Sequence, residues 1–273
     1  MAAPDVFLGL DLGSRTTKIV EMAGGAVARF EIFDTAPSSI ERVRARLDRR
    51  DYRGAAATGY GRFLMNADLG CRVVTEITAC ALGARFLRPG ADLVIDVGGQ
   101  DSKAILLGRG PGAFADFEMN DRCAAGTGRF LEVMAALLGF ALGEFGRAAG
   151  EADETIALNS MCTVFAESEV ISLLAAGRDR RAIARGLNAS IADRVYPLAA
   201  RFDPAGEVVM AGGVALNPCL LDMLSARLRR PVAVPEHPQI VAAVGAALSA
   251  AGWDPARERV KPASCPRTRK KQV

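Results

Sequence analysis

Residues 6–22, VFLGLDLGSRTTKIVEM, are two short apolar runs joined by a turn that begins Asp11-Leu12-Gly13. This pattern predicts two strands on either side of a glycine-containing turn. The pair Gly24-Gly25 follows, and it predicts a hairpin into a third strand over Ala26–Phe33. The chain therefore opens with three consecutive antiparallel strands.

The same pattern recurs in residues 93–106, LVIDVGGQDSKAIL, where the Asp-x-Gly turn begins at Asp96, 85 residues after Asp11. Such self-similarity indicates an internal duplication. Duplicated β-β-β-α-β-α halves that face one another across a cleft are the plan of the actin, Hsp70 and sugar-kinase superfamily. We therefore predict an α/β fold of the acetate and sugar kinase/Hsp70/actin type, with two lobes around a nucleotide cleft.

The predicted elements suggest where the lobes begin and end. We expect lobe I over residues 1–90, completed by a helix at about 238–254, and lobe II over 91–237. Residues 255–273 read as a basic, disordered tail. In the first lobe we expect a helix over Ile40–Arg50, with serine as its N-cap. Later helices are expected at about 127–139, 163–176, 180–200, 215–228 and 238–252.

Composition excludes several classes of protein. Hydrophobic residues make up 50% of the chain and charged residues 24%, which is typical of a soluble globular protein. A net charge of +3 is too small to indicate a nucleic-acid partner. The apolar run Ile240–Trp253 is shorter than the roughly 20 residues that span a bilayer, and the N-terminus does not resemble a signal peptide. We expect a cytoplasmic protein without a membrane partner.

Both Asp-x-Gly turns are candidate phosphate sites. Glycine lets backbone amides approach a phosphate, and small hydroxyl residues add donors. Asp11 and Asp96 are placed to hold Mg²⁺ through water. Gln100 or Asp101 could orient a lytic water, or could only cap the turn. The residues predicted to contact ATP here are Gly13, Ser14, Arg15, Thr16, Thr17, Gly98 and Gly99. The alternative is that both are ordinary hairpin turns.

A third glycine-rich turn, Gly212-Gly213-Val214-Ala215, follows a predicted strand at Glu207–Ala211. Its glycines would let the loop lie against adenine or ribose before the next helix begins. A simple strand-to-helix turn is the competing interpretation. Taken with the two Asp-x-Gly turns, the segment favours nucleotide binding.

Cys123 and Cys162 each stand just before a predicted helix, in residues 120–130, NDRCAAGTGRF, and 159–169, NSMCTVFAESE. Thiolates bind iron clusters, and a helix N-terminus stabilises their negative charge. A [4Fe–4S] cluster takes four thiolates, so two per chain indicate a homodimer with one shared cluster. A lone cysteine is otherwise usually a small buried hydrophobe. That reading is applied to Cys71, Cys80 and Cys219, with Cys265 as a tail thiol.

These segments together resemble the ATP-dependent activators of 2-hydroxyacyl-CoA dehydratases, within the wider family that includes the ATPase subunits of benzoyl-CoA reductase. The resemblance extends from about residue 6 to 250, and it implies a homodimeric ATPase with one [4Fe–4S] cluster between subunits. Cys123 and Cys162 match the cluster ligands of that family. The matching stretches are residues 9–14, 57–62, 95–103, 120–130, 162–172 and 212–215.

The resemblance also implies partners. ATP hydrolysis would drive a low-potential electron to an iron–sulfur enzyme, an acyl-CoA dehydratase or reductase, and ferredoxin or flavodoxin would reload the cluster. One departure concerns the branch of the family. Ile240-Val241 stands where dehydratase activators often carry Tyr-Asn-Gly, before a Gly-Ala-Ala helix that is kept.

Two other functions remain open at this point. One is a small-molecule, sugar-type kinase of the same fold in which the cysteines are structural, and phosphorylation of an added sugar would favour it. The other is a nucleotide-dependent assembly or chaperone-like module, which would bind a partner with ATP but without a cluster.

Overall fold

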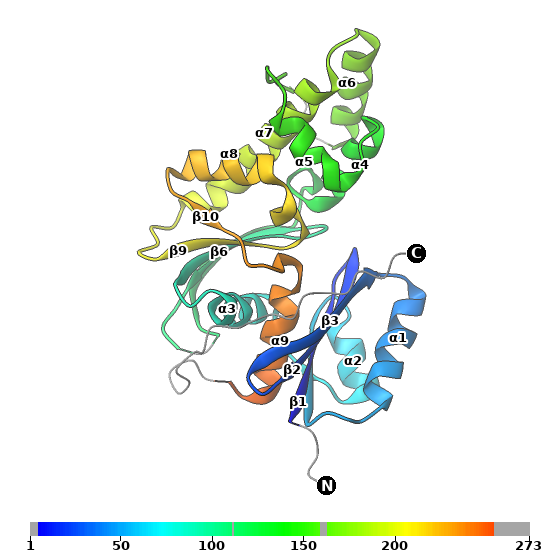
Figure 1. Cartoon of the computed structure of the whole chain (residues 1–273), viewed down its shortest axis with the longest axis vertical. Coiled ribbons are helices and arrows are strands. Elements are labelled where there is room, and N and C mark those ends of the chain that lie inside the picture. The colour runs from blue at the N-terminus through cyan, green and yellow to red at the C-terminus, as the bar shows by residue number, and fades with distance from the viewer. Residues whose placement is uncertain (1–4, 111, 159–162, 254–273) are drawn as a thin grey trace. The chain divides into compact units, whose positions relative to one another are not determined.

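The computed structural model describes residues 5–110, 112–158 and 163–253. The chain divides into two units, each built on a five-stranded mixed sheet with helices (Figure 1). Unit 1 comprises the chain up to Pro89, the short segment Arg109–Ala113 and everything from Ile240 onward. Unit 2 comprises Gly90–Gly108 and Phe114–Gln239.

The sheet of unit 1 has the strand order β3-β2-β1-β4-β5. Its central strand, β1 (Val6–Leu12), pairs antiparallel with β2 (Thr16–Ala23) and parallel with β4 (Gly54–Gly59). The outer strands are β3 (Ala26–Asp34) and β5 (Arg72–Val73). The last five residues of β1 are all buried, as expected for a strand that is covered on both faces.

Two helices of unit 1, α3 (Glu76–Leu87) and α9 (Val241–Ala251), approach each other unusually closely. A Cβ atom on Gly83 would lie 1.9 Å from the carbonyl oxygen of Val241, and one on Gly245 would lie 1.8 Å from that of Ala79. Only glycine allows such backbone contact. Helix α9, the last helix among the described residues, therefore packs into the core of the unit that contains the first strands (Figure 1).

The first helix, α1 (Pro37–Asp48), begins earlier than the sequence predicts. Its N-cap is Ala36, so the prediction of a serine cap was wrong. The Ser39 hydroxyl instead accepts the N–H of Ala36 at 2.8 Å and donates to the carbonyl of Asp34. An additional short helix, α2 (Arg62–Leu69), was not predicted.

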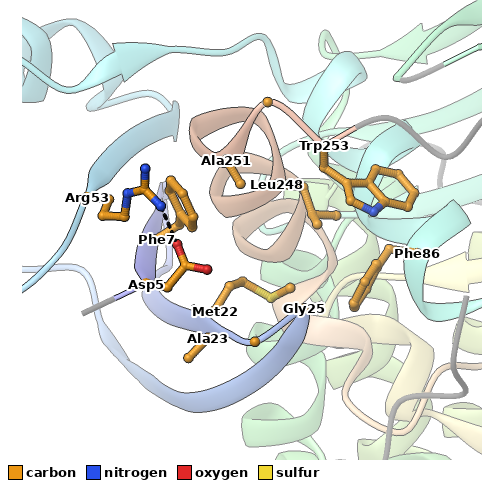
Figure 2. Close-up of a pocket in the computed structure, with 12 residues that line it drawn as sticks. Asp5, Phe7, Met22, Ala23, Gly25, Arg53, Phe86, Leu248, Ala251 and Trp253 are labelled. Carbon is orange, nitrogen blue, oxygen red and sulfur yellow. Dashed lines mark hydrogen bonds and ion pairs between the residues drawn. The ribbon is translucent and has the colours of Figure 1, made fainter. Parts of the chain in front are cut away.

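Unit 1 contains a cavity of about 410 Å³ at the beginning of β1 (Figure 2). Phe86 and Trp253 line it and pack edge to face with ring centroids 5.7 Å apart. The ion pair between Asp5 and Arg53 lies at the same cavity. Since Asp11 stands near the other end of β1, this cavity is separate from the candidate phosphate turn.

The sheet of unit 2 repeats the arrangement, with the order β10-β9-β6-β7-β8. Its central strand, β6 (Ala91–Val97), pairs antiparallel with β7 (Ser102–Leu107) and parallel with β9 (Glu207–Ala211). The outer strands are β8 (Phe114–Asn120) and β10 (Val232–Ala233). Each strand has a counterpart of the same direction in unit 1, and the predicted duplicated α/β fold is confirmed.

In the described residues five α-helices accompany the sheet of unit 2, and α4, α5 and α6 gather at one end of the unit (Figure 1). The bounds are α4 Gly128–Leu137, α5 Leu142–Gly150, α6 Thr163–Ala175, α7 Arg180–Ala200 and α8 Pro218–Leu228. The core of the unit lies between these helices and the sheet.

Two helices of unit 2 differ from expectation. The sequence does not predict α5, which follows α4 after a short turn. The helix expected at about 215–228 is two elements, a 3₁₀ helix at Gly213–Leu216 and then α8. Asn217 separates them, because its side chain caps α8 by accepting the N–H of Leu220.

Across the described residues, no single helix is both long and apolar enough to cross a membrane. The pair α4 and α5 reaches that length only together, and the two are bent by 80° relative to each other.

Candidate functional site

The first Asp-x-Gly turn, in unit 1, holds a carboxylate paired with its own lysine. Asp11 stands one residue before the end of β1 and is 8% exposed. The register of β1 and β2 places Lys18 opposite it, and the Lys18 Nζ atom lies 2.9 Å from Asp11 Oδ2. A buried carboxylate is stable as an anion when a cation accompanies it. The turn thus supplies one negative and one positive group at the same point.

Hydrogen bonds hold the backbone of this turn in shape. Thr17 is fully buried, and its hydroxyl lies 3.0 Å from the hydroxyl of Thr35. The Thr35 hydroxyl donates to the carbonyl of Gly13 at 2.8 Å. Of the hydroxyls predicted to meet phosphate, that of Thr17 is therefore already engaged inside the unit.

The other predicted contacts of this turn, Ser14–Thr16, are partly exposed. The Arg15 guanidinium lies 3.2 Å from the Asp34 carboxylate, and the side chains are 41% and 75% exposed. Surface ion pairs of this kind contribute little to stability. The pair with Asp34 by itself therefore holds the Arg15 guanidinium only weakly.

The second Asp-x-Gly turn, in unit 2, has the same lysine at the same spacing. Register places Lys103 opposite Asp96 on β6 and β7, with Nζ 3.1 Å from Asp96 Oδ2. Lys103 is only 3% exposed and also lies 2.9 Å from Asp101 Oδ2. One buried lysine therefore joins two carboxylates.

Gln100 and Asp101, the two candidates for orienting a lytic water, differ in their surroundings. Asp101 is 9% exposed, and its backbone carbonyl accepts the N–H of Gly98 at 2.9 Å, which closes the hairpin. The side chain of Gln100 is exposed. In this state Asp101 is a structural part of the turn, whereas Gln100 can meet solvent.

The third glycine turn lies against the second one. Gly212, at the end of β9, has φ of 84°, and a Cβ atom there would be 2.4 Å from the carbonyl oxygen of Val97 and 2.9 Å from Asp96 Oδ1. Gly213 is exposed, while Val214 and Ala215 are buried in the following 3₁₀ helix. The structure thus brings Asp96 and Gly212 together within unit 2.

Three groups near the two turns were not recognised as site residues from the sequence, namely Lys18, Lys103 and Gly59. Gly59 is the last residue of β4 in unit 1 and has φ of 80°, and Gly212 has the matching place in unit 2, directly after β9. A signal for the lysines was available, because each follows its aspartate by seven residues in both copies.

Two buried hydroxyls near the turns have no hydrogen-bond partner in the described part of the chain, Thr58 Oγ1 and Ser102 Oγ. Thr58 lies opposite Asp11 in the pairing of β1 and β4, and Ser102 is the residue before Lys103. A buried polar group without a partner costs about 1–3 kcal/mol. These hydroxyls remain available to a bound group or its water.

The cysteines of the described residues differ in how far their side chains are buried. Cys123 is partly exposed and precedes the 3₁₀ helix Ala124–Gly126, whereas the predicted structural cysteines Cys71, Cys80 and Cys219 are 1%, 2% and 5% exposed. Burial raises the pKa of the Cys71 thiol to about 11 and raises that of Cys219 as well. Buried thiols of this kind are unreactive.

The second candidate ligand, Cys162, lies outside the described residues, as does Cys265. Among residues 5–110, 112–158 and 163–253, no group of three or more histidine, cysteine or acidic side chains could hold a metal ion. The described chain thus offers Cys123 as a single accessible thiol.

Two units with the same strand order, each with an Asp-x-Gly turn after its central strand, define the actin, Hsp70 and sugar-kinase fold. A ROK family glucokinase from Streptomyces griseus has the same fold, at 15% identity and a TM-score of 0.57. In sequence, residues 8–250 match the model of the BadF/BadG/BcrA/BcrD ATPase family. The chain belongs to that family.

Three similar proteins, named as activators or components of acyl-CoA dehydratases, match about nine tenths of the chain. The activator of lactoyl-CoA dehydratase from Anaerotignum propionicum is 42% identical over 253 residues, 89% of this chain and 96% of that protein. The crystal structure of (R)-2-hydroxyglutaryl-CoA dehydratase component A from Acidaminococcus fermentans has a TM-score of 0.84 at 36% identity, covering 90% of this chain and 97% of that one. The activator of 2-hydroxyisocaproyl-CoA dehydratase from Clostridium difficile, with bound ADPNP, has a TM-score of 0.83 at 36% identity, covering 90% and 94%.

Proposed function

We propose that this protein is an ATP-hydrolysing iron–sulfur activator that passes low-potential electrons to a 2-hydroxyacyl-CoA dehydratase-type or benzoyl-CoA reductase-type enzyme. The observation that carries the proposal is the partly exposed Cys123 in the same unit as the Asp96 turn. The likeness of nearly the whole chain to dehydratase activators supports it.

The nucleotide part of the proposal rests on the paired turns. Asp11 and Asp96 would hold Mg²⁺ through water, because Mg²⁺ prefers carboxylate and water oxygens. Lys18 and Lys103 would then face the phosphates with the positive charge they now give to those carboxylates. Charge neutralisation of this kind is most of what phosphoryl transfer requires. A solved relative carries an ATP analogue, which supports the same use here.

The remaining nucleotide contacts are assigned by position. Gly13–Thr17 and Gly98-Gly99 would receive the phosphates, and Gly212–Ala215 would receive the adenosine. The side chains of Val214 and Ala215 are buried, so these two residues would contribute backbone. Gln100 or Asp101 would orient the lytic water, and the exposed side chain of Gln100 can reach solvent without breaking an ion pair.

Cys123 and Cys162 would bind one [4Fe–4S] cluster across the twofold axis of a homodimer, two thiolates from each protomer. The partial exposure of Cys123 fits a ligand that must meet a partner subunit, which the buried cysteines of the described chain could not do. The cluster would supply a one-electron carrier of low potential. Ferredoxin or flavodoxin would be the electron donor, in the cytoplasm.

In this proposal the two lobes respond to nucleotide. Lobe I comprises residues 1–90 with the helix at about 238–254, lobe II comprises residues 91–237, and residues 255–273 form a basic tail. A change of orientation between the lobes would alter how Cys123 and Cys162 are presented to the partner enzyme. Such a change requires ATP and ADP to favour different conformations.

The test is iron and acid-labile sulfide per chain after purification and reconstitution without oxygen. We expect about two irons per chain, since one four-iron cluster is shared by two protomers. Cys123→Ser and Cys162→Ser should each lose the iron while binding ATP, and Cys265→Ser is the matched control that should keep it. An iron-free wild-type protein that phosphorylates an added sugar would replace this proposal with a kinase.

A further inference from the structure

The loop that carries Cys123 is tied at both ends to the Asp96 turn. On the upstream side Asn120, the last residue of β8, pairs with Ser102, the first residue of β7. On the downstream side the N–H of Gly128 donates to the carbonyl of Gly98 at 2.8 Å, and the N–H of Arg129 donates to that of Gly99 at 3.0 Å. The first turn of α4 is therefore hydrogen-bonded directly to the candidate phosphate turn.

Gly128 is the point of closest approach. A Cβ atom there would lie 3.2 Å from the Gly98 carbonyl oxygen, 3.3 Å from Val214 Cγ2 and 3.7 Å from Gly99 Cα. It therefore contacts both the phosphate turn and the glycine loop that follows β9. Its backbone is helical, so alanine at this position would meet crowding without an unfavourable φ.

The loop between these ties is held together internally. Thr127 is fully buried, and its hydroxyl donates to the carbonyl of Ala124 at 2.6 Å. The Asn120 side-chain amide donates to the carbonyl of Cys123 at 3.5 Å. Gly126 lies against Arg194 of α7. Because the loop is short and internally bonded, a movement of its ends moves Cys123.

We propose that Gly128 is a positioning residue that couples the nucleotide state of the Asp96 turn to the placement of the Cys123 thiol. The inference rests on the proposed binding of nucleotide at this turn. It adds the hydrogen bonds through which a change at the turn would reach Cys123. When the carbonyls of Gly98 and Gly99 move on exchange of ATP for ADP, the two N–H donors at the start of α4 follow them. A linkage of this kind needs the two nucleotides to favour different positions of the turn.

The experiment measures the alkylation rate of Cys123 by iodoacetamide in the full-length, cluster-free protein, read by peptide mass spectrometry. In the wild type we expect the rates with Mg-ADP and with Mg-ADPNP to differ about fivefold, the low end of coupling between sites. In Gly128→Ala the added methyl pushes α4 away from the turn, so the ratio of the two rates should fall towards one. A merely structural role would change both rates and leave their ratio unaltered.

Gly143→Ala on α5 is the matched control, because a Cβ atom there meets no atom within 4 Å. It should keep the wild-type ratio. A Gly128→Ala protein that binds nucleotide and also keeps that ratio overturns the inference, as does a wild type that binds nucleotide with no rate difference.

Hydrogen exchange of the wild-type peptide that contains Gly128 and Arg129 tests the hydrogen bonds to Gly98 and Gly99 without a variant. We expect its protection to differ between Mg-ADP and Mg-ADPNP, and equal protection would overturn the coupling even if Gly128→Ala did not fold. Failure of the proposed function itself is recognised separately, by absence of nucleotide binding or of iron in the wild type.

Discussion

Gly59 and Gly212 hold equivalent positions in the two units, at the carboxyl end of the strand that runs parallel to the central strand: Gly59 is the last residue of β4, and Gly212 follows β9 directly. Their φ angles are 80° and 84°, and a Cβ atom would lie 2.5 Å from the Leu12 carbonyl oxygen in one case and 2.4 Å from that of Val97 in the other. In both units the crowded carbonyl belongs to the residue after the Asp-x-Gly aspartate. The duplication therefore extends to atomic contacts at the turns.

Gly59→Ala and Gly212→Ala should each destabilise their unit by more than the backbone conformation alone explains. Gly70→Ala is the control, since Gly70 has φ of 66° but no atom within 4 Å of an added Cβ. That change should cost about 1–2 kcal/mol for the left-handed backbone. The other two should cost more, because a backbone carbonyl must also move. Urea unfolding measures the differences, and equal costs in all three variants would refute the role of close contact.

Lys103→Met should destabilise unit 2 strongly and weaken the binding of Mg-ADP. Lys103 is 3% exposed and is shared by Asp96 and Asp101, and breaking a buried ion pair costs about 3–5 kcal/mol. Arg53→Ala removes the exposed Asp5–Arg53 pair and should cost less than about 1 kcal/mol. Chemical denaturation with and without Mg-ADP gives both quantities. If Lys103→Met lowered the free energy of unfolding as little as Arg53→Ala does, Lys103 would not be the buried partner of both carboxylates.

Asp11→Ala should lower the rate of Mg-ATP hydrolysis while leaving the iron content of reconstituted protein unchanged. We expect at least a tenfold loss in kcat, which corresponds to about 1.4 kcal/mol of transition-state stabilisation. Asp48→Ala on the exposed part of α1 is the control and should hydrolyse ATP normally. Phosphate release measures the rates, and unaltered turnover in Asp11→Ala would count against the magnesium role.

Thiol reactivity in the native protein should follow burial. Because the thiolate is the reactive form, a raised pKa keeps a thiol protonated and slow until the pH approaches that value. In the cluster-free protein the partly exposed Cys123 should be alkylated before the buried Cys71, which, with a pKa of about 11, should react only at strongly alkaline pH. Mapping iodoacetamide adducts across a pH series tests this expectation. Rapid labelling of Cys71 in folded protein at neutral pH would show that its thiol is accessible to solvent.

Much of the fold could be predicted because the duplication is local in sequence. The strand, Asp-x-Gly turn, strand pattern needs only the residues around Asp11 and Asp96, and glycine permits the backbone conformations that such turns require. Elements whose first and last residues depend on tertiary packing were harder to predict. The start of α1 at Pro37 precedes its apolar residues, and α5 contains three glycines in nine residues, so neither has a clear helical signal in the local sequence.

The candidate site was predicted less completely for a related reason. The spacing of seven residues from Asp96 to Lys103 is visible in the sequence, but its meaning depends on the register that places them opposite each other. The bond from Gly128 to Gly98 joins segments 30 residues apart and has no local signature. Contacts of this kind come from tertiary structure alone.

The close packing of α9 on α3 has a consequence for how the chain is made on the ribosome. Because α9 ends at residue 251 and belongs to unit 1, the core of that unit cannot be completed until residue 251 has been synthesised. The strands and helices of unit 2 emerge earlier and can assemble while the apolar surface of α3 still awaits its partner. The apolar surface of α3 therefore stays uncovered during synthesis until α9 has been made. A stop codon shortly before residue 241 would leave unit 1 without α9.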